Sequence, residues 1–338
     1  MRKRAFNIAI VGATGVVGET LLLLLEERKF PVDQLFLLAS EKSLGKTLSF
    51  RDQLHLVEPV DQFDFSKADI AFFAAGNEIS LKYVPMAESV GCIVIDKSSA
   101  FRYDKKVPLI VPEVNLDALN SVVAGTQRVI ANPNCNTIPI VVALKPIHDR
   151  FKITRVNIAT YQSVSGVGKK GIEALAYETA ELLSDRSLEK PTFEKQIAFN
   201  VIPKIDDFCE NGYTLEEMKV IWETQKILDP KILVNVTTVR VPVFFGHSAA
   251  VHIETKKKCD IDKVIDAWQN MPSIVYTDHE AYPTPITEAA NHDGVFVGRL
   301  RHDISHKKGL NCWVVSDNVR KGAALNAIQI AEHLVAVK

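Results

Sequence analysis

The chain contains 338 residues, of which 47% are hydrophobic and 24% are charged, and its formal net charge is −1. A chain of this length can form two domains with a large core. The near-neutral charge provides no field that would attract nucleic acid or an anionic membrane. No apolar run approaches the length of a membrane-spanning helix. We therefore expect neither nucleic acid nor a membrane as a partner.

The cysteines favour neither disulfides nor a metal site. There are five of them, at Cys92, Cys135, Cys209, Cys259 and Cys312. Their number is odd and none lies in a C-x-x-C pair, which argues against a disulfide framework or structural zinc and suits a reducing cytoplasm. No H-x-x-x-H or paired-carboxylate pattern occurs, so we expect no metal. The N-terminal apolar run is too short and too interrupted by glycine for a signal peptide.

The first elements read as a strand, a glycine turn and a helix. Residues 6–11 form a short apolar run typical of a buried parallel strand. A G-x-x-G-x-x-G turn follows at residues 12–18, and a leucine-rich helix pattern covers residues 19–29. This is the context of a dinucleotide site, although the spacing differs from G-x-G-x-x-G, and a ligand-free turn is the alternative. The candidate cofactor residues of the turn are Gly12, Thr14, Gly15, Val16 and Val17.

The second strand, at residues 35–39, ends in a loop that bears on the choice of cofactor. In an NAD site an acidic residue here holds the ribose 2′-hydroxyl, and Glu41 is available for that role. Lys42, with the hydroxyls of Ser40 and Ser43, can instead neutralise a 2′-phosphate. We favour NADP on this basis. The alternative is that all four residues are solvated loop residues.

Alternation of strands and helices continues to residue 131. Strands are expected at residues 69–76, 92–96 and 129–131, and a helix at residues 81–89 with Pro85 as a kink or break. Open α/β sheets bind ligands beyond the carboxyl ends of their strands. The glycine turn, Gly76, residues 98–102 and Cys135 would all lie on that edge.

Cys135 follows the turn Asn132-Pro133-Asn134 and precedes a helix pattern that opens at Thr137. The positive end of a helix dipole stabilises a thiolate, which favours a nucleophilic cysteine. The alternative is a buried structural cysteine.

Beyond this point the sequence predicts longer strands. A strand at residues 156–161 runs into a polar, glycine-rich turn at residues 162–168, and a helix is expected from residue 171 to about residue 186. A second helix, at residues 215–228, carries Glu216 and Lys219 on one face, where a solvated ion pair is the simpler interpretation.

Residues 232–257 are the most strand-like stretch of the chain. Arg240 near the middle of a strand needs an anionic partner or an exit to solvent, and Pro242 favours an edge or bulge. The break at Gly246-His247 can aim the imidazole into a cleft. A final helix at residues 322–337 suits packing on the first domain, which places Asn318 near the cofactor.

Together these segments resemble the aspartate-β-semialdehyde dehydrogenase family nearly end to end. The resemblance is carried by residues 12–18, 98–102, 132–137 and 162–166, by Glu216 with Lys219, and by residues 240–248. It implies an α/β protein with a Rossmann-like NADP-binding domain at residues 1–133. A C-terminal helix at residues 319–338 would return to this domain. Residues 134–318 would form an α+β catalytic and dimerisation domain.

The resemblance also assigns roles to residues. Cys135 is the implied nucleophile, His247 the general acid/base, and Gln162 the residue that orients substrate at the thiol. Arg240 would grip the substrate carboxylate, a task that suits a bidentate guanidinium. The other implied substrate or phosphate residues are Arg102, Asn134, Glu216 and Lys219. Ser165, Gly166 and Asn318 join the residues named above as cofactor positions.

The implied reaction is the NADPH-dependent reductive dephosphorylation of L-aspartyl 4-phosphate to L-aspartate 4-semialdehyde through a Cys135 thioester. It belongs to lysine, threonine and methionine biosynthesis, and the family setting implies a homodimer. Two positions depart from the family pattern, since Lys42 stands where Arg is common and Asn136 where Ser or Thr is common. The alternatives are an N-acetyl-γ-glutamyl-phosphate reductase and a catalytically silent dinucleotide-binding paralogue.

Overall fold

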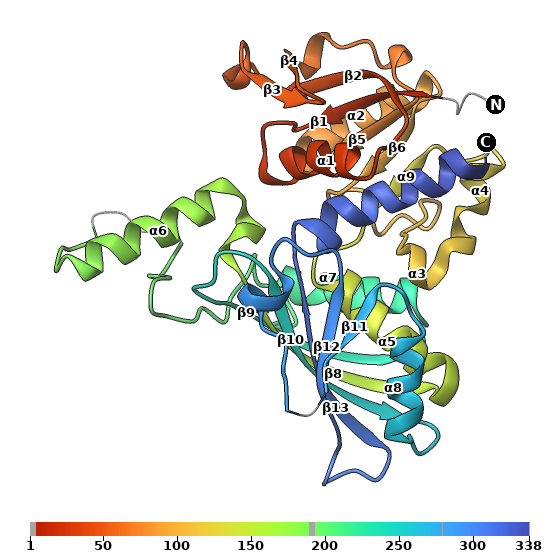
Figure 1. Ribbon diagram of the computed structural model, residues 1–338, viewed down its shortest axis with the longest axis vertical. Helices are drawn as coiled ribbons and strands as arrows, with labels where there is room; N and C mark the ends of the chain where they lie inside the picture. The colour runs from red at the N-terminus through yellow and green to blue at the C-terminus, as the bar shows by residue number, and fades with distance from the viewer. Residues whose placement is uncertain (1–4, 189–192, 279, 338) are drawn as a thin grey trace. The chain divides into compact units, whose positions relative to one another are not determined.

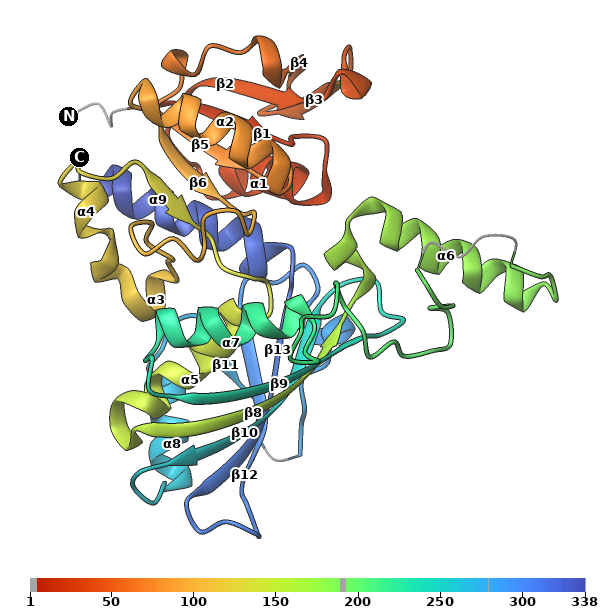
Figure 2. The same cartoon turned by 180° about the vertical axis from the view of Figure 1, so that it is seen from behind.

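The computed structural model describes residues 5–188, 193–278 and 280–337, and the chain divides into two compact units. The first unit comprises Met1–Pro133 and Ala323–Lys338, and the second comprises Asn134–Gly322. Both units combine a sheet with helices, as Figures 1 and 2 show from opposite sides.

The sheet of the first unit has seven strands in the order β3-β4-β2-β1-β5-β6-β7. All neighbours pair in parallel except β3 with β4, which pair antiparallel. The strands are β1 (Phe6–Val11), β2 (Val32–Ala39), β3 (Thr47–Phe50), β4 (Gln53–Pro59), β5 (Ile70–Phe73), β6 (Ile93–Asp96) and β7 (Val129–Ala131). Strand order reverses direction at β1, and open α/β sheets bind ligands at such a switch point.

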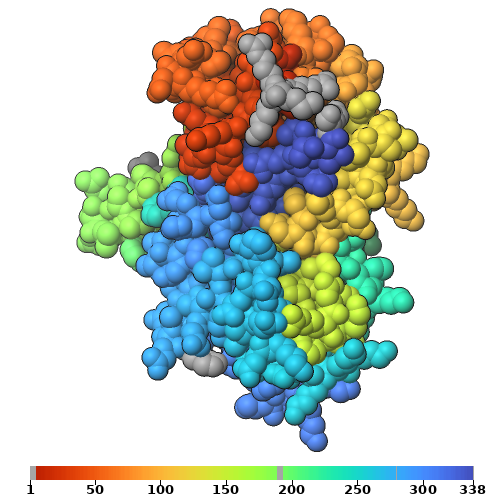
Figure 3. Space-filling view, turned by 45° about the vertical axis from the view of Figure 1, so that its right-hand side comes forward, coloured from red at the N-terminus to blue at the C-terminus, as the bar shows by residue number. Residues whose placement is uncertain are grey.

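Helices complete the core of the first unit. They are α1 (Val16–Glu27), α2 (Asn77–Ser89), α3 (Pro112–Asn115), α4 (Asn120–Val123) and α9 (Leu325–Val337). The expected C-terminal helix is therefore part of the first unit, and α9 lies beside α1 (Figure 3). Leu24 and Leu25 of α1 and Ile328 of α9 belong to one buried cluster with Ile8 and Ile10 of β1.

The structure extends α2 beyond the helix expected at residues 81–89. The helix begins at Asn77 and continues through Pro85. Proline removes one backbone donor and usually breaks a helix, but here Tyr83, Val84 and Ala87 bury the apolar face of α2. Tertiary packing therefore outweighs the local preference.

The second unit has a six-stranded mixed sheet in the order β11-β12-β13-β10-β8-β9. Its strands are β8 (Ile153–Gln162), β9 (Leu233–Arg240), β10 (His247–Thr255), β11 (Ile274–Tyr276), β12 (Val295–His302) and β13 (Gly309–Ser316). Arg240 is the last residue of β9 and Pro242 lies after it. The expectation of an arginine near the middle of a strand was therefore wrong, because the chain leaves the sheet between β9 and β10.

Three helices of the second unit contact this sheet. They are α5 (Thr137–Phe151), α7 (Leu215–Ile227) and α8 (Ile261–Gln269), and α5 packs against both of the others. Another helix of this unit, α6 (Lys169–Leu183), extends away from the sheet (Figure 2). On the other face of the sheet, Tyr161 is exposed and Trp313 is half-buried, and their rings lie 5.4 Å apart. In the part of the chain that the structure describes, no helix is long and apolar enough to cross a membrane.

Candidate functional site

The glycine turn after β1 is shaped by close backbone packing. Gly12 has φ +87°, and a Cβ there would lie 2.8 Å from the carbonyl oxygen of Ala74. A Cβ on Gly18 would lie 2.2 Å from the carbonyl oxygen of Gly12. Only glycine fits either position, since both contacts are with backbone. Gly15 is the N-cap of α1 and provides no side-chain cap, so the helix N-terminus faces the turn with its backbone N–H groups, as a pyrophosphate site requires.

Other expected cofactor residues of the first unit surround this turn. Thr14 and Ser43 share a hydrogen bond of 3.1 Å between their hydroxyls, which ties the turn to the loop after β2. Ser43 is buried, whereas Ser40 and Lys42 are exposed and available to a ligand. Val16 and Val17 are half-buried in the first turn of α1. Gly76 is exposed, with φ +96°, and is the N-cap of α2.

Arg102 is held firmly within the first unit. It is buried, and its guanidinium donates to the carbonyl oxygens of Asn132 over 3.0 Å and Lys97 over 2.6 Å. The loop that carries it is anchored by the buried Asp96, which accepts the hydroxyl of Ser98 over 2.6 Å. Burial raises the pKa of the Asp96 carboxyl, while the hydrogen bonds from Ser98 and Ser80 act in the opposite direction.

The Cys135 turn belongs to the second unit, and the carboxylate of Glu216 holds its side chains in place. Glu216 Oε1 accepts hydrogen bonds from Asn134 Nδ2 over 2.9 Å, Asn136 Nδ2 over 3.2 Å and Gln162 Nε2 over 3.4 Å. Asn136 is the N-cap of α5, and its Nδ2 also lies 3.9 Å from Cys135 Sγ. Cys135 is half-buried and stands directly before α5, as the sequence predicted.

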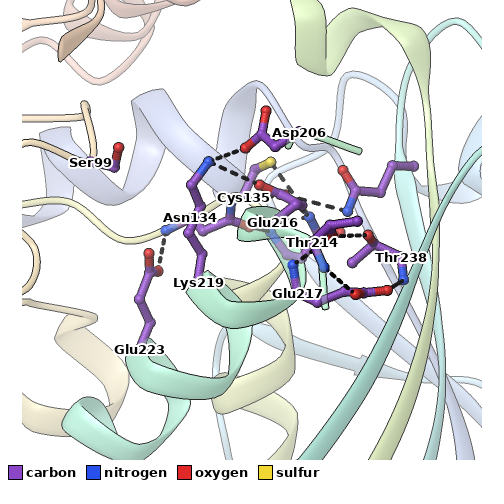
Figure 4. Close-up of polar contacts among 12 residues, drawn as sticks. Ser99, Asn134, Cys135, Asp206, Thr214, Glu216, Glu217, Lys219, Glu223 and Thr238 are labelled. Atoms are coloured by element: carbon purple, nitrogen blue, oxygen red, sulfur yellow. Dashed lines mark hydrogen bonds and ion pairs between the residues drawn. The ribbon is translucent and has the colours of Figure 1, made fainter. Parts of the chain in front are cut away.

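Helix α7 supports the turn with a second carboxylate, from Glu223 (Figure 4). Glu223 is fully buried and accepts the backbone N–H of Asn134 over 2.6 Å. A capping box between Thr214 and Glu217 begins the helix, and Glu217 also accepts the backbone N–H of Thr238 in β9 over 3.0 Å. The helix is therefore fixed to the sheet at one end and to the cysteine turn along one face.

His247, the first residue of β10, is oriented by Ser163. Both the backbone N–H and the hydroxyl of Ser163 lie 3.1 Å from His247 Nδ1. A backbone N–H only donates, so in the neutral ring Nδ1 is the acceptor and the proton is on Nε2. Asn318 Oδ1 accepts from the backbone N–H of Gly246 over 2.9 Å and from the hydroxyls of Ser163 and Ser165.

Arg240 is buried against the same turn. Its Nη1 donates to the carbonyl oxygen of Ser163 over 2.8 Å. Burial lowers the pKa of the guanidinium, and the negative charges of Glu216, Cys135 and Asp206 oppose that effect. A Cβ on Gly166 would lie 3.0 Å from Arg240 Nη1 and 3.4 Å from His247 Nε2, so Gly166 leaves room for both side chains.

Lys219 lies between two carboxylates. Its ammonium is 3.4 Å from Glu216 Oε2 and forms a closer ion pair with Asp206. The side chains of Lys219 and Glu216 are 14% and 7% exposed. The simple interpretation of a solvated ion pair was therefore wrong, because the pair is mostly withdrawn from water.

The structure gathers most of the expected residues into two sets. The second unit brings together Asn134, Cys135, Gln162, Ser165, Gly166, Glu216, Lys219, Arg240, His247 and Asn318, whereas Arg102 and the glycine turn belong to the first unit. Sequence reasoning did not single out Ser163, Asp206 or Glu223 as site residues. Of these, Ser163 could have been found from its place inside the turn at residues 162–168.

Among the described residues, no group of three or more His, Cys, Asp or Glu side chains could hold a metal ion. The polar side chains gathered with Cys135 in the second unit are instead amides, one imidazole, one guanidinium, one ammonium and carboxylates. These groups suit acyl chemistry on an anionic substrate.

Comparisons with known proteins identify the family of the chain. A family model described as the semialdehyde dehydrogenase NAD binding domain matches residues 7–122, and one described as the dimerisation domain matches residues 144–321. Aspartate-semialdehyde dehydrogenase 2 of Vibrio cholerae is 55% identical over 331 residues, 98% of each chain. Aspartate-semialdehyde dehydrogenase of Rickettsia conorii is 45% identical over 335 residues, again 98% of each chain.

Solved structures show the same likeness. Aspartate semialdehyde dehydrogenase II of Vibrio cholerae, complexed with ASA, has a TM-score of 0.96 and 54% identity, covering 98% of this chain and 99% of that one. A probable aspartate-semialdehyde dehydrogenase of Pseudomonas aeruginosa has a TM-score of 0.94 and 37% identity over the same shares. The chain therefore belongs to the aspartate-semialdehyde dehydrogenase family.

Proposed function

We propose that this protein reduces L-aspartyl 4-phosphate to L-aspartate 4-semialdehyde with NADPH, through a thioester on Cys135. One observation carries the proposal: Ser163 holds His247 through its N–H and Arg240 through its carbonyl, in the unit that contains Cys135. An acid/base and an anion-binding group are thereby fixed relative to each other. The Vibrio cholerae relative complexed with ASA supports the substrate class.

The residues of the chain account for the covalent steps. The Cys135 thiolate attacks the acyl carbon of aspartyl phosphate, the C–S bond forms as the bond to the phosphate oxygen breaks, and inorganic phosphate leaves. When bound, the nicotinamide cofactor supplies the hydride that reduces the thioester. As the C–S bond then breaks to release the semialdehyde, His247 donates the proton that the sulfur takes up.

Substrate binding is assigned to charged side chains. Arg240 would hold the carboxylate of the substrate by a two-point contact. Arg102 and Lys219 would bind the phosphate. Glu216 would orient substrate and, with Asn134 and Gln162, keep the cysteine turn in place.

The first unit fits a dinucleotide. The turn at residues 12–18 admits no side chain at Gly12 or Gly18, and α1 directs its N-terminus to the turn. NADP rather than NAD is proposed because Lys42 is exposed beside the hydroxyls of Ser40 and Ser43, where a 2′-phosphate would need a cation. Ser165, Gly166 and Asn318 of the second unit are proposed to contact the cofactor as well.

A homodimer is also proposed, formed through the second unit. The match to a dimerisation domain at residues 144–321 supports this assembly. The sheet face that carries Tyr161 and Trp313 is the proposed contact surface, because these large aromatic side chains remain partly accessible in the single chain.

The deciding experiment is reduction of NADP by purified protein with aspartate semialdehyde, with and without phosphate. Turnover that requires phosphate supports the proposal, and Cys135→Ala should abolish it while NADP binding persists. Turnover only with N-acetylglutamate semialdehyde would indicate an N-acetyl-γ-glutamyl-phosphate reductase. Folded protein with a free Cys135 thiol that is silent in every assay would indicate a catalytically silent paralogue.

The cofactor assignment is tested by two neighbouring substitutions. Lys42→Ala should raise the KM for NADP by about tenfold or more, since charge-assisted contacts contribute about 1.5–3 kcal/mol. The KM for NAD should change little. Glu41→Gln is the matched control, and a loss of NAD rather than NADP binding in the Lys42 variant would contradict the assignment.

A further inference from the structure

The carboxylate of Asp206 lies in the part of the site that is proposed to bind anions, where a negative charge is unexpected. It lies in the loop before α7 and forms an ion pair with the Lys219 ammonium (Figure 4). Its negative charge also acts on the guanidinium of Arg240. A carboxylate therefore faces the two cations of the second unit that are proposed to bind phosphate and substrate.

The surroundings allow Asp206 to leave this position. A pocket of about 580 Å³ is lined by Asp206, Arg240, Lys204 and Phe208. The Asp206 side chain is 41% exposed, whereas that of Glu216, on the other side of Lys219, is 7% exposed and bound to three amides. Asp206 also has φ +64°, a left-handed conformation that aspartate tolerates but does not prefer. Of the two carboxylates, only Asp206 is free of such a network and has space to move into.

The charge balance shows what this movement would do. Arg240 and Lys219 contribute two positive charges, and Glu216 and Asp206 contribute two negative charges. While Asp206 is paired with Lys219, the charges of these four side chains sum to zero. An incoming dianion then gains little electrostatic stabilisation from them. Withdrawal of Asp206 makes the charge of this group one unit more positive, which favours binding of an anion.

We propose that Asp206 is a displaceable counter-ion that occupies Lys219 until a phosphate-class anion takes its place. The proposal rests on the proposed function, in which inorganic phosphate is the leaving group. Return of Asp206 to Lys219 competes with that phosphate, so it weakens retention of the product and favours its release. Asp206 itself takes no part in bond making or breaking.

The test is calorimetric titration of inorganic phosphate into the full-length protein and its variants. Asp206→Asn removes the charge and keeps a residue that tolerates a positive φ. It should bind phosphate about threefold to tenfold more tightly, as expected for loss of a partly exposed ion-pair competitor. The KM for phosphate should fall by a similar factor in the phosphorylating direction.

Asp207→Asn is the matched control, because Asp207 is exposed, lines the same pocket and carries the same charge. It should leave phosphate affinity near that of the unchanged protein. Equal tightening by both variants would overturn the proposal, since the effect would then be one of net charge alone. Unchanged or weaker binding by Asp206→Asn would overturn it too.

Asp206→Gly provides a second variant if the first does not fold, because glycine adopts φ +64° without steric strain. The two levels of inference remain separable. If the unchanged protein binds no phosphate, the result contradicts both the proposed phosphate site and the counter-ion role of Asp206. If the unchanged protein binds phosphate and the variants bind it no better, only the counter-ion role fails.

Discussion

Ser163 holds His247 with two groups at once, since its backbone N–H and its hydroxyl both lie 3.1 Å from Nδ1. The N–H fixes Nδ1 as an acceptor in the neutral ring and leaves the proton on Nε2. If Nδ1 becomes protonated, the Ser163 hydroxyl can accept from it, but the backbone N–H then faces another donor, which disfavours the charged ring. Ser163 therefore favours the neutral tautomer of His247 in which Nε2 carries the proton.

His247→Asn should lower kcat by about 10²–10⁴-fold, the usual contribution of a positioned acid/base group. The KM for aspartate semialdehyde should change little, because Arg240, the residue proposed to bind the carboxylate, is unchanged. His306→Asn is the control, since His306 is exposed. Steady-state kinetics of both variants provide the check, and near-normal kcat in the His247 variant would exclude it as the acid.

Gly166→Ala should damage the site without unfolding the protein. The new Cβ would lie 3.0 Å from Arg240 Nη1, so the guanidinium must shift by a few tenths of an ångström. Small displacements of positioned groups are costly in catalysis, and we expect kcat/KM to fall by about tenfold or more. Thermal unfolding should show little change, and an unaltered kcat/KM would mean that the guanidinium can move without loss.

Glu223→Ala tests the second carboxylate beneath the cysteine turn. The substitution leaves the buried N–H of Asn134 without this acceptor, which should cost about 1–3 kcal/mol of stability. Glu223→Gln keeps an acceptor oxygen and should lose less. Thermal unfolding and kcat are measured together, and a Glu223→Ala protein that matches the unchanged protein in both would rule out the anchoring role.

The thiols should differ sharply in reactivity. Burial raises the pKa of Cys92 and of Cys312 to about 12 and also raises the pKa of Cys259. At neutral pH these three thiols remain protonated, so iodoacetamide should label Cys135 in the folded protein and spare them. Peptide mass spectrometry before and after denaturation gives the comparison, and early labelling of Cys92 or Cys312 would contradict it.

The raised pKa values of Cys92 and Cys312 also make the free energy of unfolding depend on pH. In the unfolded chain these thiols ionise near their ordinary pKa of 9.0, whereas Cys92 and Cys312 stay neutral in the folded state until about 12. The folded state then binds more protons than the unfolded state, so stability is fully present below about pH 9 and falls as the pH rises towards 12. Urea denaturation at a series of alkaline pH values measures the loss, and replacing Cys312 by Ala should reduce its slope.

Parts of the fold governed by local chemistry were predictable from sequence. The strand, glycine turn and helix around Gly12 were recognised because an apolar run and glycine spacing are local signals. Cys135 before α5 was recognised for the same reason. The extent of α2 was missed because buried packing of Tyr83 and Val84 carries the helix through Pro85.

The contacts that assemble the site were less predictable. Glu223 and the backbone N–H of Asn134 meet although they are 89 positions apart, and no spacing rule relates them. Arg240 was expected to need an anionic partner or an exit to solvent, but it is buried and its Nη1 donates to the carbonyl oxygen of Ser163. Such contacts depend on how α7 and β9 pack, and this packing is set by the whole unit.

The composition of the first unit from two distant chain segments affects the order of folding during synthesis. Residues up to Pro133 emerge from the ribosome first, but the buried cluster of that unit also requires Leu325, Ile328, Ile330 and Leu334 of α9. Those residues are translated only after the entire second unit. The nucleotide-binding unit is therefore begun before the second unit and completed after it, and its apolar surface stays incompletely covered until α9 has been translated.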